Sequence, residues 1–143
     1  MRNCLWKYEA LARRSGHALG PVVTTAAQTF PTPIVSLCGG VGAARFLRGL
    51  VRVVDPADVT AIVNTGDDRV FYGVHVSPDL DTVLYTLAGV ANTAVGWGRE
   101  GETWNFLQEL ERIGGSAWFK LGDRDLVVHD EANRAAATTS VAM

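Results

Sequence analysis

A short apolar run that ends in glycines constrains this chain more than any other feature of its sequence. The run at residues 34–37 and Cys38 leads into Gly39, Gly40 and Gly42, and an amphipathic helical pattern begins at once. A strand, a glycine turn and a helix N-terminus together present unpaired backbone N–H groups that an anion can approach. The pattern therefore predicts a strand–turn–helix unit. Its spacing alone leaves a phosphate contact and a plain tight turn equally open.

Two common phosphate-binding signatures are absent from this turn. No Gly-Lys-Ser/Thr follows the glycines, so the P-loop pattern fails, and Ala43 to Arg45 stand where the third glycine of a dinucleotide-binding turn belongs. Asn64 ends the next apolar run, where a ribose-binding acid is expected. Arg45 lies in the first helical turn, where a cation is disfavoured by the helix dipole unless an anion is near. That placement modestly favours the phosphate interpretation.

Strand-like and helix-like patterns alternate along residues 34–129. Apolar runs predict strands at 34–37, 59–63, 71–76 and 117–121, and amphipathic patterns predict helices over about 41–54, 78–88 and 103–113. This alternation predicts an α/β fold, a Rossmann-like parallel sheet with helices on both faces. Ligands of such sheets bind outside the carboxyl ends of the strands. We expect the glycine turn and the turns at 66–68 and 122–125 to meet there.

The two ends of the chain read differently from this middle part. Pro31 and Pro33 precede the first strand and favour extended chain, so residues 1–33 are predicted to be a poorly ordered N-terminal extension. After His129 the sequence has no strand pattern and only weak helical amphipathicity, which predicts a divergent tail at 130–143. A sheet that stops there leaves an exposed edge, so we interpret residues 34–129 as part of a truncated domain.

Composition excludes several classes of function. A chain of 143 residues with a net charge of −2 has room for about one domain and lacks the basic face of a nucleic-acid-binding protein. No apolar run approaches the roughly 18 residues that span a membrane. Cys4 and Cys38 are too few for a disulfide framework, which favours a reducing, cytoplasmic location.

Carboxylates gather in the turns that this fold places on one rim. Asp67 and Asp68 are a candidate Mg²⁺ site, although Asp after Gly is also a common turn former. Asp79 and Asp81 begin a predicted helix, where acids are stabilising in any case. Four or more acids, with Asp123 from a third turn, repel one another unless a cation binds. The rim therefore predicts a cation site.

Other chemistry-bearing residues give weaker indications. Trp97 and Trp104 flank a polar loop, where each can stack on a flat aromatic ligand or simply pack locally. His75 and His129 lack the spacing of zinc ligands. Cys38 has no cationic neighbour in sequence that indicates a nucleophile.

Five motifs occur in a characteristic order. They are Gly39-Gly40-Val41-Gly42, Asn64-Thr65-Gly66-Asp67-Asp68, Pro78-Asp79-Leu80-Asp81-Thr82, Trp97-Gly98 with Glu102-Thr103-Trp104, and Leu121-Gly122-Asp123-Arg124-Asp125. Together they closely resemble the 2-phospho-L-lactate transferase family of coenzyme F420 biosynthesis. The resemblance covers residues 34–129 and corresponds to the N-terminal part of that family.

The resemblance implies a transferase that joins a phospholactyl or phosphoenolpyruvyl group to the deazaflavin alcohol Fo. The donor is a guanosine diphosphate adduct, GMP leaves and Mg²⁺ is required. Asp67 matches the metal-ligating acid, with Asp68 beside it. Asp81 and Lys120 match positions that contact the deazaflavin, and Asp81 is also the candidate catalytic residue, orienting or deprotonating the attacking hydroxyl. The implied substrate-binding set is Gly39, Gly40, Gly42, Thr65, Gly66, Asp81, Lys120 and Asp123.

This sequence departs from the family in two ways. Ala43 replaces a glycine found in many relatives, and the second half that completes the family's sheet does not follow residue 129. Two alternatives therefore stay open: a non-catalytic nucleotide-sugar-binding regulator of the related family, and an inactive remnant. The expected partners are small molecules, with neither nucleic acid nor membrane, and a homodimer is left open.

Overall fold

The computed structural model of the chain describes residues 31–140. Most of the predicted extension, including Cys4, lies outside the described residues, as do residues 141–143. The described elements are β1 (Ile34–Cys38), α2 (Val41–Leu50), the 3₁₀ turn η1 (Pro56–Asp58), β2 (Val59–Val63), β3 (Arg69–Phe71), β4 (Val74–Val76), α3 (Pro78–Leu87), α4 (Asn105–Arg112) and α5 (Asp123–Ser140). Within these residues no helix is long and apolar enough to cross a bilayer.

The parallel pair β1–β2, with α2 as its crossover, confirms the predicted α/β fold. The register runs from Ile34 opposite Val59 to Cys38 opposite Val63, and both strands lie close to their predicted bounds. α2 packs on one face of this pair, where Leu47 joins Cys38 in a buried cluster. The rest of that core is Ala44 and Val83, with Ala43, Leu50, Val59, Val63 and Leu87 packed around it.

The opposite face of the β1–β2 pair is open in the described part of the chain. Val35 is 61% exposed, Leu37 is 82% exposed and Ile62 is 54% exposed. Side chains of a strand alternate between the two faces of a sheet, so these residues point away from α2. The helical layer predicted for both faces is thus seen on one face here.

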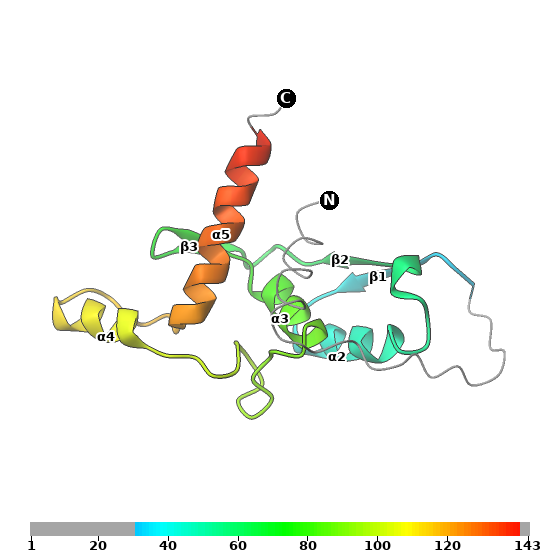
Figure 1. Ribbon diagram of the computed structural model, residues 1–143, viewed down its shortest axis with the longest axis horizontal. Coiled ribbons are helices and arrows are strands. Elements are labelled where there is room, and N and C mark those ends of the chain that lie inside the picture. Colours follow the sequence, from blue (N-terminus) through cyan, green and yellow to red (C-terminus); the bar gives the residue numbers. More distant parts are fainter. Residues whose placement is uncertain (1–30, 141–143) are drawn as a thin grey trace.

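α3 lies beside α2 and brings its first turn to the carboxyl ends of β1 and β2 (Figure 1). Pro78 occupies the first helical position after Ser77, and the predicted acids follow in the first turn. The Ser77 side chain makes no capping hydrogen bond to α3 and donates to Asp68 instead. Gly89 has a φ of 69° and lies just beyond the helix end, a conformation that glycine adopts readily.

The single strand predicted at 71–76 is wrong. This stretch forms most of an antiparallel hairpin in which β3 pairs with β4, separate from the β1–β2 sheet. Tyr72 and Gly73 form its turn with φ values of 51° and 82°. Positive φ at both central residues is the geometry that matches the twist of a two-residue hairpin. Gly73 was the signal in the sequence for this reversal.

The strand predicted at 117–121 is also absent, and the turn expected at 122–125 is instead the start of α5. The apolar run packs through side chains: Phe119 stacks on Phe71 with ring centroids 3.6 Å apart. Tyr72 Oη donates a hydrogen bond to the Phe119 carbonyl at 2.8 Å. Backbone pairing is therefore replaced by aromatic packing against the hairpin.

α5 packs against β4 and runs through residue 129 without a break (Figure 1). The division into residues 1–33, 34–129 and 130–143 stays a prediction. α4 lies at one end of the molecule, away from the β1–β2 pair, and is shorter than the predicted 103–113.

Candidate functional site

The glycine turn faces a carboxylate from α3. An added Cβ on Gly40 would lie 2.7 Å from Asp79 Oδ1, and one on Gly39 would lie 3.6 Å from Asp79 Oδ2. Asn64, at the carboxyl end of β2, donates from Nδ2 to Asp79 Oδ2 at 2.9 Å. The absence of a side chain at Gly40 thus lets Asp79 approach the start of α2, whereas a Cβ on Gly39 would make only an ordinary van der Waals contact. Gly42 has open space around it.

The turn after β2 lies in the same place. Gly66 N donates to Asn64 Oδ1 at 3.1 Å, and Asn64 Nδ2 also lies 3.5 Å from Asp67 Oδ1. Thr65 closes the turn by accepting from the backbone of Asp68 at 3.2 Å. One amide therefore brings the carboxylates of Asp67 and Asp79 together beside the glycine turn.

The chemistry of this donor set fits Mg²⁺. Magnesium is bound by oxygen ligands and commonly takes only one or two carboxylates, with phosphates and waters completing the shell. Asp67 and Asp79 meet that requirement, and no cluster of three or more metal-ligating side chains occurs among the described residues. Asp68 Oδ2 accepts a hydrogen bond from Ser77 Oγ at 2.8 Å and lies 3.9 Å from His75 Nε2, while Asp68 Oδ1 is buried and has no hydrogen-bond partner among the described residues. The Asn64 amide, which lies against both Asp67 and Asp79, is what groups Asp79 with Asp67.

A cavity of about 320 Å³ opens between α3 and α5. We call it the α3–α5 cavity. It brings together Asp81 and Lys120, which the resemblance assigned to the same ligand. The other lining residues that matter below are Tyr85, Trp97, Asp125 and His129.

Buried polar groups form the base of this cavity. Asp81 is 5% exposed and His129 is 1% exposed. His129 Nε2 lies 3.6 Å from Asp81 Oδ2 and 3.4 Å from Asp125 Oδ1. Tyr85 Oη donates a hydrogen bond to Asp125 Oδ1, and burial, with the Asp125 charge adding to it, raises the pKa of Tyr85. The base of the cavity is therefore made of buried polar side chains.

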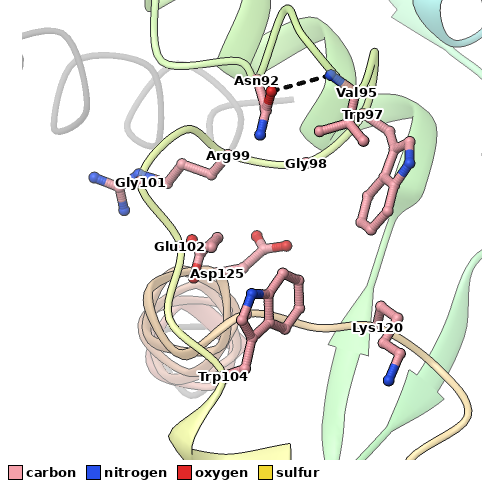
Figure 2. A pocket seen from close by; sticks show the side chains of 11 residues that line it. Asn92, Val95, Trp97, Gly98, Arg99, Gly101, Glu102, Trp104, Lys120 and Asp125 are labelled. Carbon is pink, nitrogen blue, oxygen red and sulfur yellow. Dashed lines mark hydrogen bonds between the residues drawn. The ribbon is translucent and has the colours of Figure 1, made fainter.

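A second hollow of about 270 Å³ continues from this cavity and shares Trp97, Gly98, Lys120 and Asp125 with it. Figure 2 shows the indoles of Trp97 and Trp104 on two sides of the hollow, with Lys120 near its edge. Flat indole faces, with Lys120 and Arg99 as cations in the lining, suit a planar, polar aromatic ligand. Trp97 was singled out in the sequence, but only the fold places it beside Lys120.

Glu102 also lines the second hollow. Its Oε2 accepts from the backbone of Arg124 at 2.9 Å, which caps the start of α5, and burial raises the pKa of Glu102. An added Cβ on Gly122 would lie 2.1 Å from the same Oε2. A residue without a side chain is therefore needed at position 122 for this cap to form. The sequence had instead predicted that Gly122 belongs to a ligand-binding turn.

Asp123 has a structural role in the described chain. Its carboxylate accepts from Thr103 Oγ1 at 2.6 Å, and from Asn105 N and Phe106 N at 2.9 Å each. Asn105 Nδ2 donates as well, at 2.8 Å. These bonds cap the start of α4 and lower the pKa of Asp123 to about 2, the Thr103 hydroxyl being the largest cause. Asp123 lines none of the cavities described above.

This cap predicts a pH dependence of stability. Because the pKa of Asp123 is depressed in the folded protein, its stabilisation is complete above about pH 4, the unfolded value, and is lost as the pH falls through about 2. Asp123→Asn should flatten the stability profile between these limits in denaturant unfolding at stepped pH. Asp55→Asn, which keeps a cap on η1, should retain the wild-type slope. Equal slopes in all three proteins would contradict the prediction.

The candidate residues thus fall into two adjacent groups. Gly39, Gly40, Thr65, Gly66 and Asp67 meet at the glycine turn, and Asp81 and Lys120 meet in the α3–α5 cavity. The first turn of α3 joins the groups, because Asp79 faces one and Asp81 faces the other. The sequence alone indicated no role for His129, Tyr85 or Asn64. The four-residue spacing of Asp125 and His129 was the available signal for the contact between these two side chains.

Comparisons with known proteins agree on one family. A family model described as 2-phospho-L-lactate transferase CofD matches residues 34–139, which extends ten residues past the predicted boundary. The chain is 55% identical over 98 residues to a phosphoenolpyruvate transferase of Kitasatospora aureofaciens. It is 56% identical over 97 residues to one of Streptomyces avermitilis and 44% identical over 110 residues to one of Mycobacterium tuberculosis. Each alignment covers 67% of this chain but only 30%, 30% and 33% of the relative, in that order.

Proposed function

This chain belongs to the 2-phospho-L-lactate transferase CofD family, and from that membership we propose that it supplies the acceptor and metal side of a transferase in coenzyme F420 biosynthesis. The proposed reaction moves a phospholactyl or phosphoenolpyruvyl group from a guanosine diphosphate adduct to Fo and releases GMP. The name phosphoenolpyruvate transferase, carried by the relatives, favours the phosphoenolpyruvyl group. Since the chain spans about 30% of their length, the catalytic unit as a whole is part of the proposal.

One observation carries the assignment of the acceptor. Asp81, Lys120 and Trp97 line one cavity although they come from three separate segments of the chain. The Trp97 and Trp104 indoles offer faces for the deazaflavin ring, and the Lys120 ammonium suits its carbonyl oxygens. The Asp81 carboxylate accepts a hydrogen bond from the attacking hydroxyl of Fo and holds it toward the donor phosphorus.

The metal belongs in the other group of residues. Asp67 and Asp79 would hold Mg²⁺ beside the glycine turn, where the ion supplies charge neutralisation to donor phosphates when it is bound. Phosphoryl transfer depends chiefly on positioning and electrostatic stabilisation, so the chain's own task is to orient the acceptor. The shared first turn of α3 fixes the position of Asp81 relative to Asp79.

Titration with Fo tests the proposal directly. We expect saturable binding by the purified chain, followed by deazaflavin fluorescence, and about tenfold weaker binding for Trp97→Ala because one stacking face is lost. Trp118→Ala is the matched control. Trp118 is 72% exposed, packs on Phe71 and Phe119, and lines none of the cavities described here, so its loss should leave Fo binding unchanged.

The outcomes separate the candidate functions. Failure of wild-type chain to bind Fo would overturn the acceptor assignment, and binding of a nucleotide sugar instead would favour the regulatory alternative. Equal weakening by both tryptophan variants would show that the effect is not specific to the cavity.

A further inference from the structure

His129 of α5 lies buried at the base of the α3–α5 cavity, and the proposed reaction leaves it without a role. Its side chain is 1% exposed and lines the cavity. Neither ring nitrogen makes a hydrogen bond to a residue that the structure describes. Buried polar atoms are normally hydrogen-bonded, and an unsatisfied one lowers stability. Packing alone therefore gives no reason for a histidine at this position.

Two pairs of polar side chains face each other between α3 and α5. Asp81 and Tyr85 are four residues apart on α3, so they share one helix face. Asp125 and His129 have the same spacing on α5. The pairs meet in reverse order, because Tyr85 Oη donates a hydrogen bond to Asp125 Oδ1 and His129 Nε2 lies 3.6 Å from Asp81 Oδ2. The four side chains therefore form one continuous polar group that joins the two helices.

Asp125 is the anchored member of this group. Burial, with the Asp125 charge adding to it, raises the pKa of Tyr85, so the Tyr85 hydroxyl stays protonated and keeps its bond to Asp125. His129 Nε2 lies 3.4 Å from the same Asp125 oxygen. The separations from Nε2 to both carboxylates exceed the roughly 2.7–3.2 Å of an N–H···O bond by a few tenths of an ångström. A small movement of the ring therefore brings Nε2 within bonding distance of Asp81.

The orientation of the Asp81 carboxylate matters directly for the proposed reaction. A reacting group must be held within about 0.5 Å of its productive position by neighbours that lock its rotamer. The carboxylates of Asp81 and Asp125 lie on either side of one ring nitrogen and repel each other, and an N–H between them offsets that repulsion. His129 Nε2 is placed to supply this N–H.

We propose that His129 is a positioning residue for Asp81. Its Nε2 directs the Asp81 carboxylate toward the acceptor hydroxyl, and Asp125, held by Tyr85, fixes the His129 ring. This inference rests on the proposed function, because Asp81 is the group assigned to the Fo hydroxyl. His129 is not assigned a contact with Fo, so its effect on the acceptor must pass through Asp81.

A double-mutant cycle followed by Fo fluorescence tests the inference in the purified chain. We expect His129→Leu to weaken Fo binding about tenfold, as for a lost hydrogen bond to a charged group. In the Asp81→Asn background the same change should alter the dissociation constant by less than about twofold, because the carboxylate that His129 orients is gone.

Conservative variants at the same position provide a second measurement. The amide of His129→Gln reaches the place of Nε2 and keeps a donor there, so Fo binding should return to within about threefold of wild type. The shorter amide of His129→Asn reaches only the place of Nδ1 and should bind Fo as weakly as His129→Leu. This comparison needs neither the apolar variant nor Asp81→Asn. His75→Leu is the matched control, because His75 is a half-exposed histidine that lines neither hollow, and it should leave Fo binding unchanged.

The outcomes separate this inference from the acceptor assignment. If the wild-type chain binds Fo, additive effects of His129→Leu and Asp81→Asn overturn the role of His129 alone. Equal Fo affinities of the Gln and Asn variants, or equal weakening in the His75 control, overturn it as well. A wild-type chain that does not bind Fo overturns the acceptor assignment and, with it, the role given to His129.

Discussion

Asp81→Asn is expected to lower the rate of GMP release from the guanylated donor by roughly 100-fold, the size of effect that follows when a reacting group is misplaced by about 1 Å. Asp81 is held in place at the base of the α3–α5 cavity, where it is 5% exposed and lies 3.6 Å from His129. The amide presents a donor in place of one carboxylate oxygen, so it no longer offers two acceptors to the Fo hydroxyl.

The measurement is GMP formation with Fo, donor and Mg²⁺, alongside Fo binding for the same proteins. Asp55→Asn is the matched control, because Asp55 caps η1 and lines no cavity described here. Unchanged turnover in Asp81→Asn would contradict the role of Asp81. A wild-type chain that binds Fo and releases no GMP would restrict the proposed function of this chain to acceptor binding.

Leu47→Ala is expected to reduce the free energy of unfolding by about 2–5 kcal/mol, the range for truncating a buried leucine. Leu47 is 1% exposed and packs with Cys38, Ala44 and Val83, the cluster that joins α2 to the sheet and to α3. The cavity left by the truncation removes packing contacts with the sheet, with α2 and with α3. The same cluster fixes the position of the glycine turn relative to the first turn of α3, so Fo binding should weaken as well.

Phe46→Ala is the natural control for this prediction. Phe46 is the preceding residue of α2 and is 59% exposed, so its truncation should change stability by no more than about 0.5 kcal/mol. Denaturant unfolding of the two variants and the wild type decides the matter. Equal losses for Leu47→Ala and Phe46→Ala would mean that the α2–sheet cluster does not stabilise the chain.

Local patterns along the sequence were sufficient for several elements. The bounds of β1 and β2, the proline start of α3 and the glycine that ends it all follow from short-range rules, because strands buried on a face and helix ends are signalled within a few residues. The family was also identifiable from the sequence, because the residue types and the order of its motifs can be read without knowing the fold.

The sequence patterns did not predict which strands pair with one another. Residues 71–76 and 117–121 are apolar enough for strands, and nothing local states which partner a strand takes. The former folds back on itself at Tyr72 and Gly73, and the latter packs its rings against the resulting hairpin. A run of apolar residues specifies burial, and the choice between backbone pairing and side-chain packing is made by the neighbours.

The site divides in the same way. The sequence by itself determined which residue types are available: glycines before α2, an Asn and acids after β2, and acids in the first turn of α3. Only the tertiary structure decided their partners, pairing Asp79 with Asn64 at the glycine turn, committing Asp123 to the cap of α4, and placing His129 against Asp81. The physical reason is that a carboxylate's role depends on the donors within about 3 Å of it, and those donors come from segments that are distant in the chain.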